Sequence, residues 1–174
     1  MSGKITLPST DDSGTLLTNI GDFSSCNKIT HVFFLQTANY SAVNNNAFRN
    51  NSLLQYIELP NSVISLGDSA FNLDSKLDIP ELSDNIIEIG EEAFGACSSL
   101  KWTKLPSKLT KIKRRAFVNA SKLNITSLPK NITVVEEATF RHDAQVNISV
   151  FGYNPNGELL AEDNMITKIE SDAF

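Results

Sequence analysis

The chain carries a 23-residue repeat, and this period constrains its fold more than any other feature. An Ala-Phe or Thr-Phe dipeptide recurs with this spacing at 47–48, 70–71, 93–94, 116–117 and 139–140. A final Ala-Phe pair at 173–174 follows after a 34-residue interval, so the last interval carries 11 extra residues. Self-similarity with a period of roughly 20 to 50 residues indicates an array of stacked units.

Apolar residues keep the same place in each unit. The sixth position after each phenylalanine holds Leu54, Leu77, Leu100, Leu123 and Val146, and the fifth position before each holds Val43, Leu66, Ile89, Ile112, Val135 and Ile169. One such unit cannot close a core alone, but stacked units can, because each coil covers the open face of its neighbour. The leucine-to-proline stretch predicts a short strand ended by proline. The segments 68–71 and 91–94 predict single helical turns with acids near their N-termini.

The unit resembles the BspA-like leucine-rich repeat, a 23-residue class found in bacterial and protist surface proteins. The copy over residues 87–100 matches the family core Ile-Gly-x-x-Ala-Phe-x-x-Cys-x-x-Leu in full. The resemblance implies a right-handed leucine-rich repeat solenoid of short parallel β-strands and short helical turns, with a parallel sheet lining a concave face. It also implies a cell-surface or extracellular protein that adheres to matrix proteins or other cells.

We expect residues 1–15 to form an N-terminal extension and residues 16–174 to form a single repeat domain. That domain would hold a degenerate first unit, about five 23-residue units, and an incomplete last unit. The extra residues near 151–161 predict a loop or hairpin, because Tyr153-Asn154-Pro155-Asn156-Gly157 is rich in turn formers.

Composition argues against several classes of partner and site. A net charge of -5 argues against a nucleic-acid or anionic-membrane surface. No run approaches the roughly 18 apolar residues of a membrane-spanning helix. The first eight residues lack the apolar segment of a signal peptide, so a cytoplasmic location stays open beside the surface location that the resemblance implies.

Catalytic chemistry has little support. The two histidines, His31 and His142, lie about five units apart, too far to share a metal at roughly 5 Å per coil. We therefore expect no enzyme, no cofactor and no metal site.

The two cysteines are too far apart to bond. Cys26 and Cys97 occupy the same unit position three coils apart, about 15 Å by sheet spacing, which predicts buried thiols and not a disulfide.

Six sequons would permit N-glycosylation in a secretory pathway, at Asn39, Asn50, Asn119, Asn124, Asn131 and Asn147.

A basic cluster over residues 101–115 stacks on an acidic coil in the repeat frame. Subtracting 23 pairs Lys101 with Asp78, Lys104 with Glu81, Lys111 with Glu88, Arg114 with Glu91 and Arg115 with Glu92. Glu136 and Glu137 should lie on the other side, above Lys113 and Arg114. We interpret the cluster as a ladder of ion pairs that favours one stacking order, and not as an anion site.

The predicted concave strand carries two neighbouring rows of side chains. The eighth position after each phenylalanine reads His31, Tyr56, Ile79, Trp102, Ile125, Ile148, and the ninth reads Val32, Ile57, Pro80, Thr103, Thr126, Ser149. In the family pattern the second row points inward, which would leave an aromatic and aliphatic stripe on the surface. The alternative is a local register change that buries Ile125 and Ile148. We expect Tyr56 and Trp102 to be exposed, and both arrangements stay open for the isoleucines.

This stripe is the candidate site. An apolar column with a charged column beside it is typical of a protein-binding site, which has an apolar centre and a polar rim. The predicted contacts are Tyr56, Glu58, Ile79, Glu81, Trp102 and Lys104. The chain is accordingly predicted to be a non-enzymatic interaction module that binds a protein or a glycan. The alternative is a structural scaffold that self-associates through an open solenoid end.

Overall fold

The computed structural model describes residues 3–35, 37–142, 146 and 166–174. The insertion predicted near 151–161 lies outside the described residues, as do Asn147, Ile148 and Ser149.

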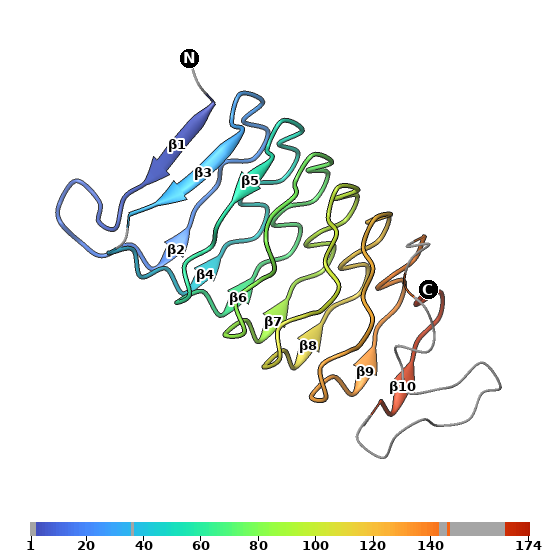
Figure 1. The fold of residues 1–174 in the computed structure, drawn as a ribbon. Coiled ribbons are helices and arrows are strands. Elements are labelled where there is room, and N and C mark those ends of the chain that lie inside the picture. The colour runs from blue at the N-terminus through green and yellow to red at the C-terminus, as the bar shows by residue number, and fades with distance from the viewer. Residues whose placement is uncertain (1–2, 36, 143–145, 147–165) are drawn as a thin grey trace.

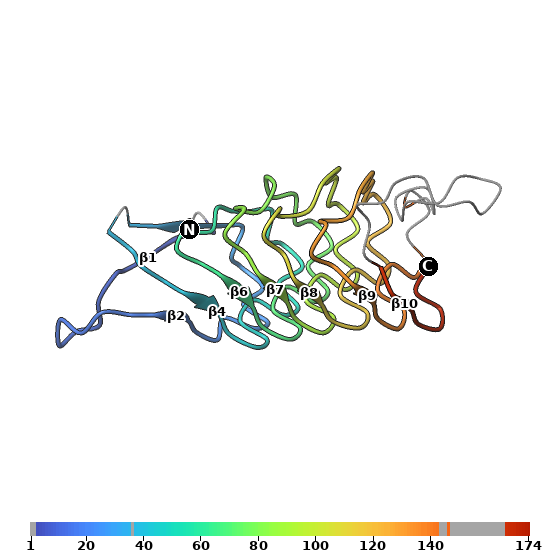
Figure 2. The same ribbon diagram turned by 90° about the horizontal axis from the view of Figure 1, so that it is seen from below.

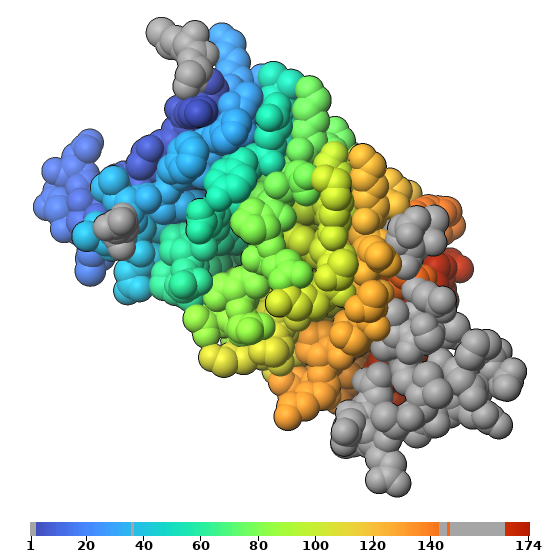
Figure 3. Space-filling model, viewed as in Figure 1, coloured from blue at the N-terminus to red at the C-terminus, as the bar shows by residue number. Residues whose placement is uncertain are grey.

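The chain winds as a solenoid whose coils stack in sequence order, and Figure 3 shows them as successive coloured bands. Two walls run along the stack, and short parallel strands form the N-terminal end of the first wall and the length of the second (Figures 1 and 2). The first wall contains β1 (Lys4–Leu7), β3 (His31–Phe34) and β5 (Tyr56–Ile57). The second wall contains β2 (Asn19–Ile20), β4 (Ala42–Val43), β6 (Ser65–Leu66), β7 (Glu88–Ile89), β8 (Lys111–Ile112), β9 (Val134–Val135) and β10 (Lys168–Ile169).

Strand pairing follows the sequence period. Ser65 pairs with Glu88, and Glu88 pairs with Lys111, so each step across the second wall is one 23-residue unit. Val134 pairs with Lys168 across the 34-residue interval, so the coils before and after that interval are still direct neighbours. The predicted parallel solenoid is therefore confirmed.

A column of phenylalanine rings forms the centre of the core. Neighbouring rings from Phe48 to Phe140 are separated by 5.2–5.7 Å between centroids and lie within 7° of parallel. These rings are almost completely buried, at Phe48, Phe71, Phe94, Phe117 and Phe140. The even spacing follows because each coil adds one ring, as the repeat predicts.

The predicted helical turns are wrong, since the described part of the chain contains no helix. Glu92 and Ala96 have φ values of 52° and 58°, in the left-handed region, which interrupts a right-handed helical run. The backbone N–H of Phe94 donates across the stack to Ala116 O at 2.8 Å. Alternate N–H groups of this turn therefore bond to the next coil, whereas those between them, such as that of Gly95 to Glu92 O, bond within the turn.

Close packing between coils explains two glycines. A Cβ on Gly67 would lie 2.5 Å from the backbone nitrogen of Asn45, and one on Gly90 would lie 2.5 Å from the backbone carbon of Gly67. Only glycine allows such an approach without moving backbone.

Candidate binding surface

The first wall is built in two different ways along its length. In β3 and β5, Val32 and Ile57 are buried, while His31 and Tyr56 are partly exposed on the outer face. In the later coils the arrangement reverses. There the eighth-position residues Ile79, Trp102 and Ile125 are buried and the ninth-position residues Pro80, Thr103 and Thr126 are exposed.

Proline and side-chain polarity account for this reversal. Pro80 stands one unit after Ile57 and has no N–H to donate, and the sheet of β1, β3 and β5 ends at β5. In each coil the more apolar of the two neighbouring residues turns inward, as expected where burial of apolar surface is the dominant favourable term. Of the two arrangements left open for Ile125, the structure shows the one with the register change, since this residue is 1% exposed.

The prediction that Trp102 is exposed is wrong. Its side chain is 3% exposed, and the indole Nε1–H donates to the carbonyl oxygen of Ile79 at 3.0 Å. The ring meets Phe94 edge-on at 4.9 Å between centroids. Trp102 and Ile79 are therefore core residues, because the indole has both an apolar site and a partner for its polar atom.

The early coils carry a cluster of three rings on the outer face. The ring centroids of His31, Phe33 and Tyr56 are 6.1–6.2 Å apart in all three pairs. Phe33 is 38% exposed. Phe33 was not among the residues predicted for the site. It follows His31 by two residues on a strand, so both side chains were to be expected on one face. We call His31, Phe33 and Tyr56 the aromatic cluster.

Of the predicted contacts, Tyr56 and Glu58 lie together, while Glu81 and Lys104 lie together on later coils. The Tyr56 hydroxyl donates to Glu58 Oε2 at 2.8 Å, and this hydrogen bond raises the pKa of Tyr56 above its ordinary value. Glu81 forms an ion pair with Lys104 at 2.9 Å. The structure thus retains four predicted residues on the surface and moves Ile79 and Trp102 into the core.

Two hollows flank the aromatic cluster. One, of about 610 Å³, is bordered by Phe33 and Glu58. The other, of about 490 Å³, is bordered by His31 and Tyr56 and also by Lys101, which is paired with Asp78. The cluster therefore forms a partly apolar ridge with polar groups on both sides.

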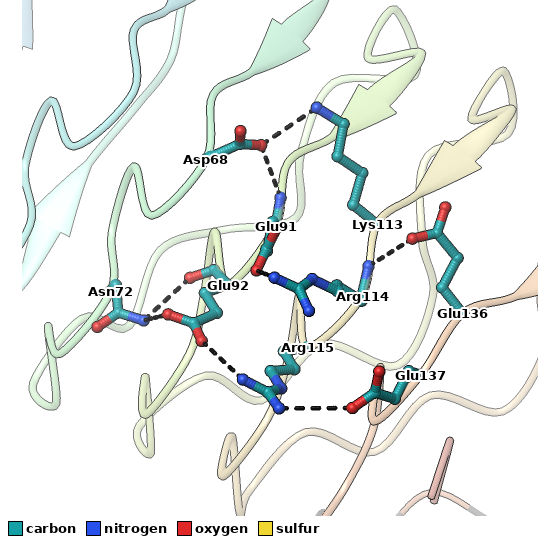
Figure 4. A network of polar contacts seen from close by, with 9 residues as sticks. All are labelled: Asp68, Asn72, Glu91, Glu92, Lys113, Arg114, Arg115, Glu136 and Glu137. Atoms are coloured by element: carbon teal, nitrogen blue, oxygen red, sulfur yellow. Dashed lines mark hydrogen bonds and ion pairs between the residues drawn. The ribbon is translucent and has the colours of Figure 1, made fainter. Parts of the chain in front are cut away.

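The basic coil is neutralised by the coils beside it. Ion pairs join Lys101 to Asp78, Arg114 to Glu91 at 2.6 Å, and Arg115 to both Glu92 at 3.7 Å and Glu137 at 3.4 Å. Figure 4 shows part of this network. The ladder interpretation is confirmed for the pairs of Lys101, Arg114 and Arg115 with Asp78, Glu91 and Glu92, and the cluster does not present unpaired charge as a block.

Two details of the ladder differ from prediction. Glu88 contacts Lys113 at 3.0 Å, and not Lys111, because the Lys113 side chain reaches back over two coils and also contacts Asp68 at 3.1 Å. These contacts raise the pKa of Lys113. Glu136 accepts from the backbone N–H of Arg114 at 2.8 Å, so the last acidic coil is offset by one residue from the predicted pairing.

A polar column runs through the core three residues after the phenylalanines. Asp74 Oδ1 accepts from the backbone N–H of Asn51 at 2.7 Å, whereas Asp74 Oδ2 and Asn51 Oδ1 are buried without a hydrogen-bond partner. Burial raises the pKa of Asp74 to about 8. The Cys97 thiol is buried and donates to Phe71 O at 3.0 Å. Cys26 is half-buried, and both cysteines are free, as predicted.

Within the described ranges, no group of three or more histidine, cysteine or acidic residues is placed to hold a metal ion, and no helix is long and apolar enough to cross a membrane.

Comparison with known proteins identifies the repeat. A BspA-type leucine-rich repeat region matches residues 18–147 in six copies. The chain belongs to the BspA-type leucine-rich repeat family. This BspA-type chain is similar in fold to the leucine-rich repeat protein TpLRR of T. pallidum, with a TM-score of 0.73 and 23% identity over 82% of this chain and 66% of that one. No curated protein matches its sequence.

Two further solved structures share the fold. A leucine-rich repeat protein from Bacteroides ovatus has a TM-score of 0.70 and 23% identity over 96% of this chain and 45% of that one. A leucine-rich cell surface protein from Faecalibacterium prausnitzii has a TM-score of 0.57 and 21% identity over 98% of this chain and 48% of that one. This BspA-type chain therefore spans between 45% and 66% of the length of these three proteins.

Proposed function

We propose that this chain is a non-enzymatic interaction module of a cell-surface protein, and that it binds a protein or glycan through the outer face of β3 and β5. Its repeat family suggests a protein-interaction module. One structural neighbour carries the description of a cell surface protein, which supports the same location here.

The aromatic cluster carries the proposal. Its rings lie on a strand wall whose later coils turn their apolar side chains inward, so the apolar surface of this wall is concentrated on β3 and β5. Aromatic side chains surrounded by polar groups are enriched among residues that dominate binding energy. Glu58 lies beside the rings, and the Glu81–Lys104 pair provides a polar rim.

A binding screen tests the proposal. The immobilised chain is exposed to purified matrix proteins and to a glycan array, and each hit is repeated with the double variant Phe33→Ala/Tyr56→Ala. We expect the double variant to weaken binding by more than about 2 kcal/mol. The matched control is Ile64→Ala/Ile87→Ala, which removes two exposed apolar residues near the second wall, and it should bind like the parent. Binding that survives the first variant and is lost in the second would contradict the assignment.

A further inference from the structure

Glu58 differs from the other acids of the first wall in its charge balance. Asp78 and Glu81 are each paired with a lysine of the next coil, Lys101 and Lys104. The carboxylate of Glu58 instead accepts from the neutral hydroxyl of Tyr56, and among the described residues it forms no ion pair. An exposed and unneutralised negative charge therefore lies directly beside the aromatic cluster.

The lining of the 610 Å³ hollow next to Glu58 suits a long side chain with a positively charged end. Its wall is apolar at Phe33, Leu35, Leu59 and Pro60, and Asn61 and Ser62 add hydrogen-bonding groups. Glu58 is the charged residue of this lining, and no lysine or arginine of the described ranges borders the hollow. The arrangement offers a long side chain an apolar contact along its stem and a carboxylate for its end.

We propose that this hollow holds an arginine or lysine side chain of a partner protein, with Glu58 as its counter-ion and Phe33 of the aromatic cluster as its apolar contact. The inference rests on the proposed function and names the class of its ligand. Arginine suits the site best, because its guanidinium stacks on aromatic faces and pairs with a carboxylate through two parallel hydrogen bonds. The net charge of -5 favours the approach of a basic segment. A neutral sugar would gain neither the ion pair with Glu58 nor the attraction of the net negative charge.

The test uses the full chain and a randomised decapeptide display library. We expect the selected peptides to share an arginine or lysine at one position. The best peptide is then titrated by fluorescence polarisation, alongside a copy in which citrulline, a neutral isostere, replaces the arginine. Citrulline should weaken binding about fivefold at low salt, the upper range for an exposed ion pair.

Variants of the chain test whether the loss of affinity with citrulline comes from the contact with Glu58. Glu58→Gln should weaken the arginine peptide by a similar factor, and citrulline should then cost nothing further, because both changes remove one interaction. Glu88→Gln is the matched control, since Glu88 lies in β7 of the second wall, outside the candidate site, and is paired with Lys113 at 3.0 Å; it should change binding less than twofold. Melting temperatures close to that of the parent would show that both variants fold.

The outcomes separate this inference from the proposed function. Selected peptides without a shared basic residue, or an equal citrulline effect in the parent and in Glu58→Gln, would overturn the inference. Glycan-array binding that depends on Phe33 and Tyr56 but not on Glu58 would overturn it too, while supporting the proposed surface. Ligand binding that ignores the Phe33→Ala/Tyr56→Ala variant would overturn both.

Discussion

The early and late coils of the first wall use the same repeat to make opposite surfaces. On β3 and β5 the ninth-position residues fill the core, and the rings of His31 and Tyr56 remain outside. From Ile79 onward the eighth-position residues fill the core, and Pro80 and Thr103 remain outside. The comparison teaches that one shift in strand alternation converts an aromatic surface into a polar one without changing the repeat.

The core column changes at a different coil. Asn51 and Asp74 occupy it in the units of Phe48 and Phe71, whereas Cys97 and Ala120 occupy it in the next two units. Asp74 therefore lies in the same unit as the buried Ile79, so the unsatisfied polar atoms extend one coil beyond the aromatic cluster.

The largest expected effect separates Trp102 from Tyr56. Trp102→Ala should lower the free energy of unfolding by about 3–5 kcal/mol, since it leaves a cavity between Phe94 and Phe117 and removes the hydrogen bond to Ile79. Tyr56→Ala should cost less than about 1 kcal/mol, because this ring lies on the outer face. Urea unfolding followed by circular dichroism measures both. Equal losses of unfolding free energy would show that the rings of Trp102 and Tyr56 are equally buried.

The pH dependence of stability tests the early core column. Burial raises the folded-state pKa of Asp74 from 3.8 to about 8, so between these values the folded chain keeps a proton that the unfolded chain releases. Its contribution to stability is complete below about pH 4 and is lost as the pH rises through about 8. Between about pH 5 and pH 7 the free energy of unfolding should fall by about 2–3 kcal/mol.

Asp74→Asn provides the control for this pH effect. The nearest titratable neighbour is Cys97, whose pKa is raised by burial and by Asp74, so its thiol stays protonated over the same range. The difference between the parent and Asp74→Asn should therefore isolate the carboxyl. Parallel pH curves for the two proteins would show that Asp74 is ionised in the fold.

A pair of substitutions tests the strand alternation directly. Ile57→Thr should cost about 2 kcal/mol, because it removes buried apolar volume and buries a hydroxyl. Thr103→Val, at the ninth position of a later coil, should change stability by less than about 0.5 kcal/mol, since Thr103 is exposed. Chemical denaturation of both variants suffices, and a Thr103→Val variant that stabilises the fold by more than about 1 kcal/mol would show that Thr103 faces the core.

The smallest expected effect concerns the ion-pair ladder of the later coils. Reversing Lys104 and Arg114 to glutamate should lower the melting temperature by a few degrees at low salt, because Glu81 and Glu91 lose their partners and face like charges. The loss should largely disappear at about 1 M salt, where the Debye length is about 3 Å. Thermal melting at two salt concentrations measures it. A loss that salt does not reduce would point to packing by the side-chain stems.

The sequence predicts the fold well and the exposure of the candidate site residues only in part. The phenylalanine column, the parallel walls and four of the ion pairs follow from positions one repeat unit apart, because stacked coils place such positions side by side. The exposure of the candidate residues was harder to predict, since His31 and Trp102 share a unit position but lie on opposite sides of the wall. A signal was available: Val32 and Ile57 are apolar where Pro80 and Thr103 are not.

By itself, therefore, the sequence determined the period, the stacking order and the family, since these depend only on which residue types recur at a fixed spacing. Tertiary structure alone decided which way each strand residue points, because that choice depends on competition between neighbouring side chains for one core. It also decided that the carboxylate of Glu58 lies beside a hollow that no described lysine or arginine borders, whereas that of Glu81 is paired with Lys104. Equivalent positions in a repeat share a backbone environment, and their neighbours in space give them different chemistry.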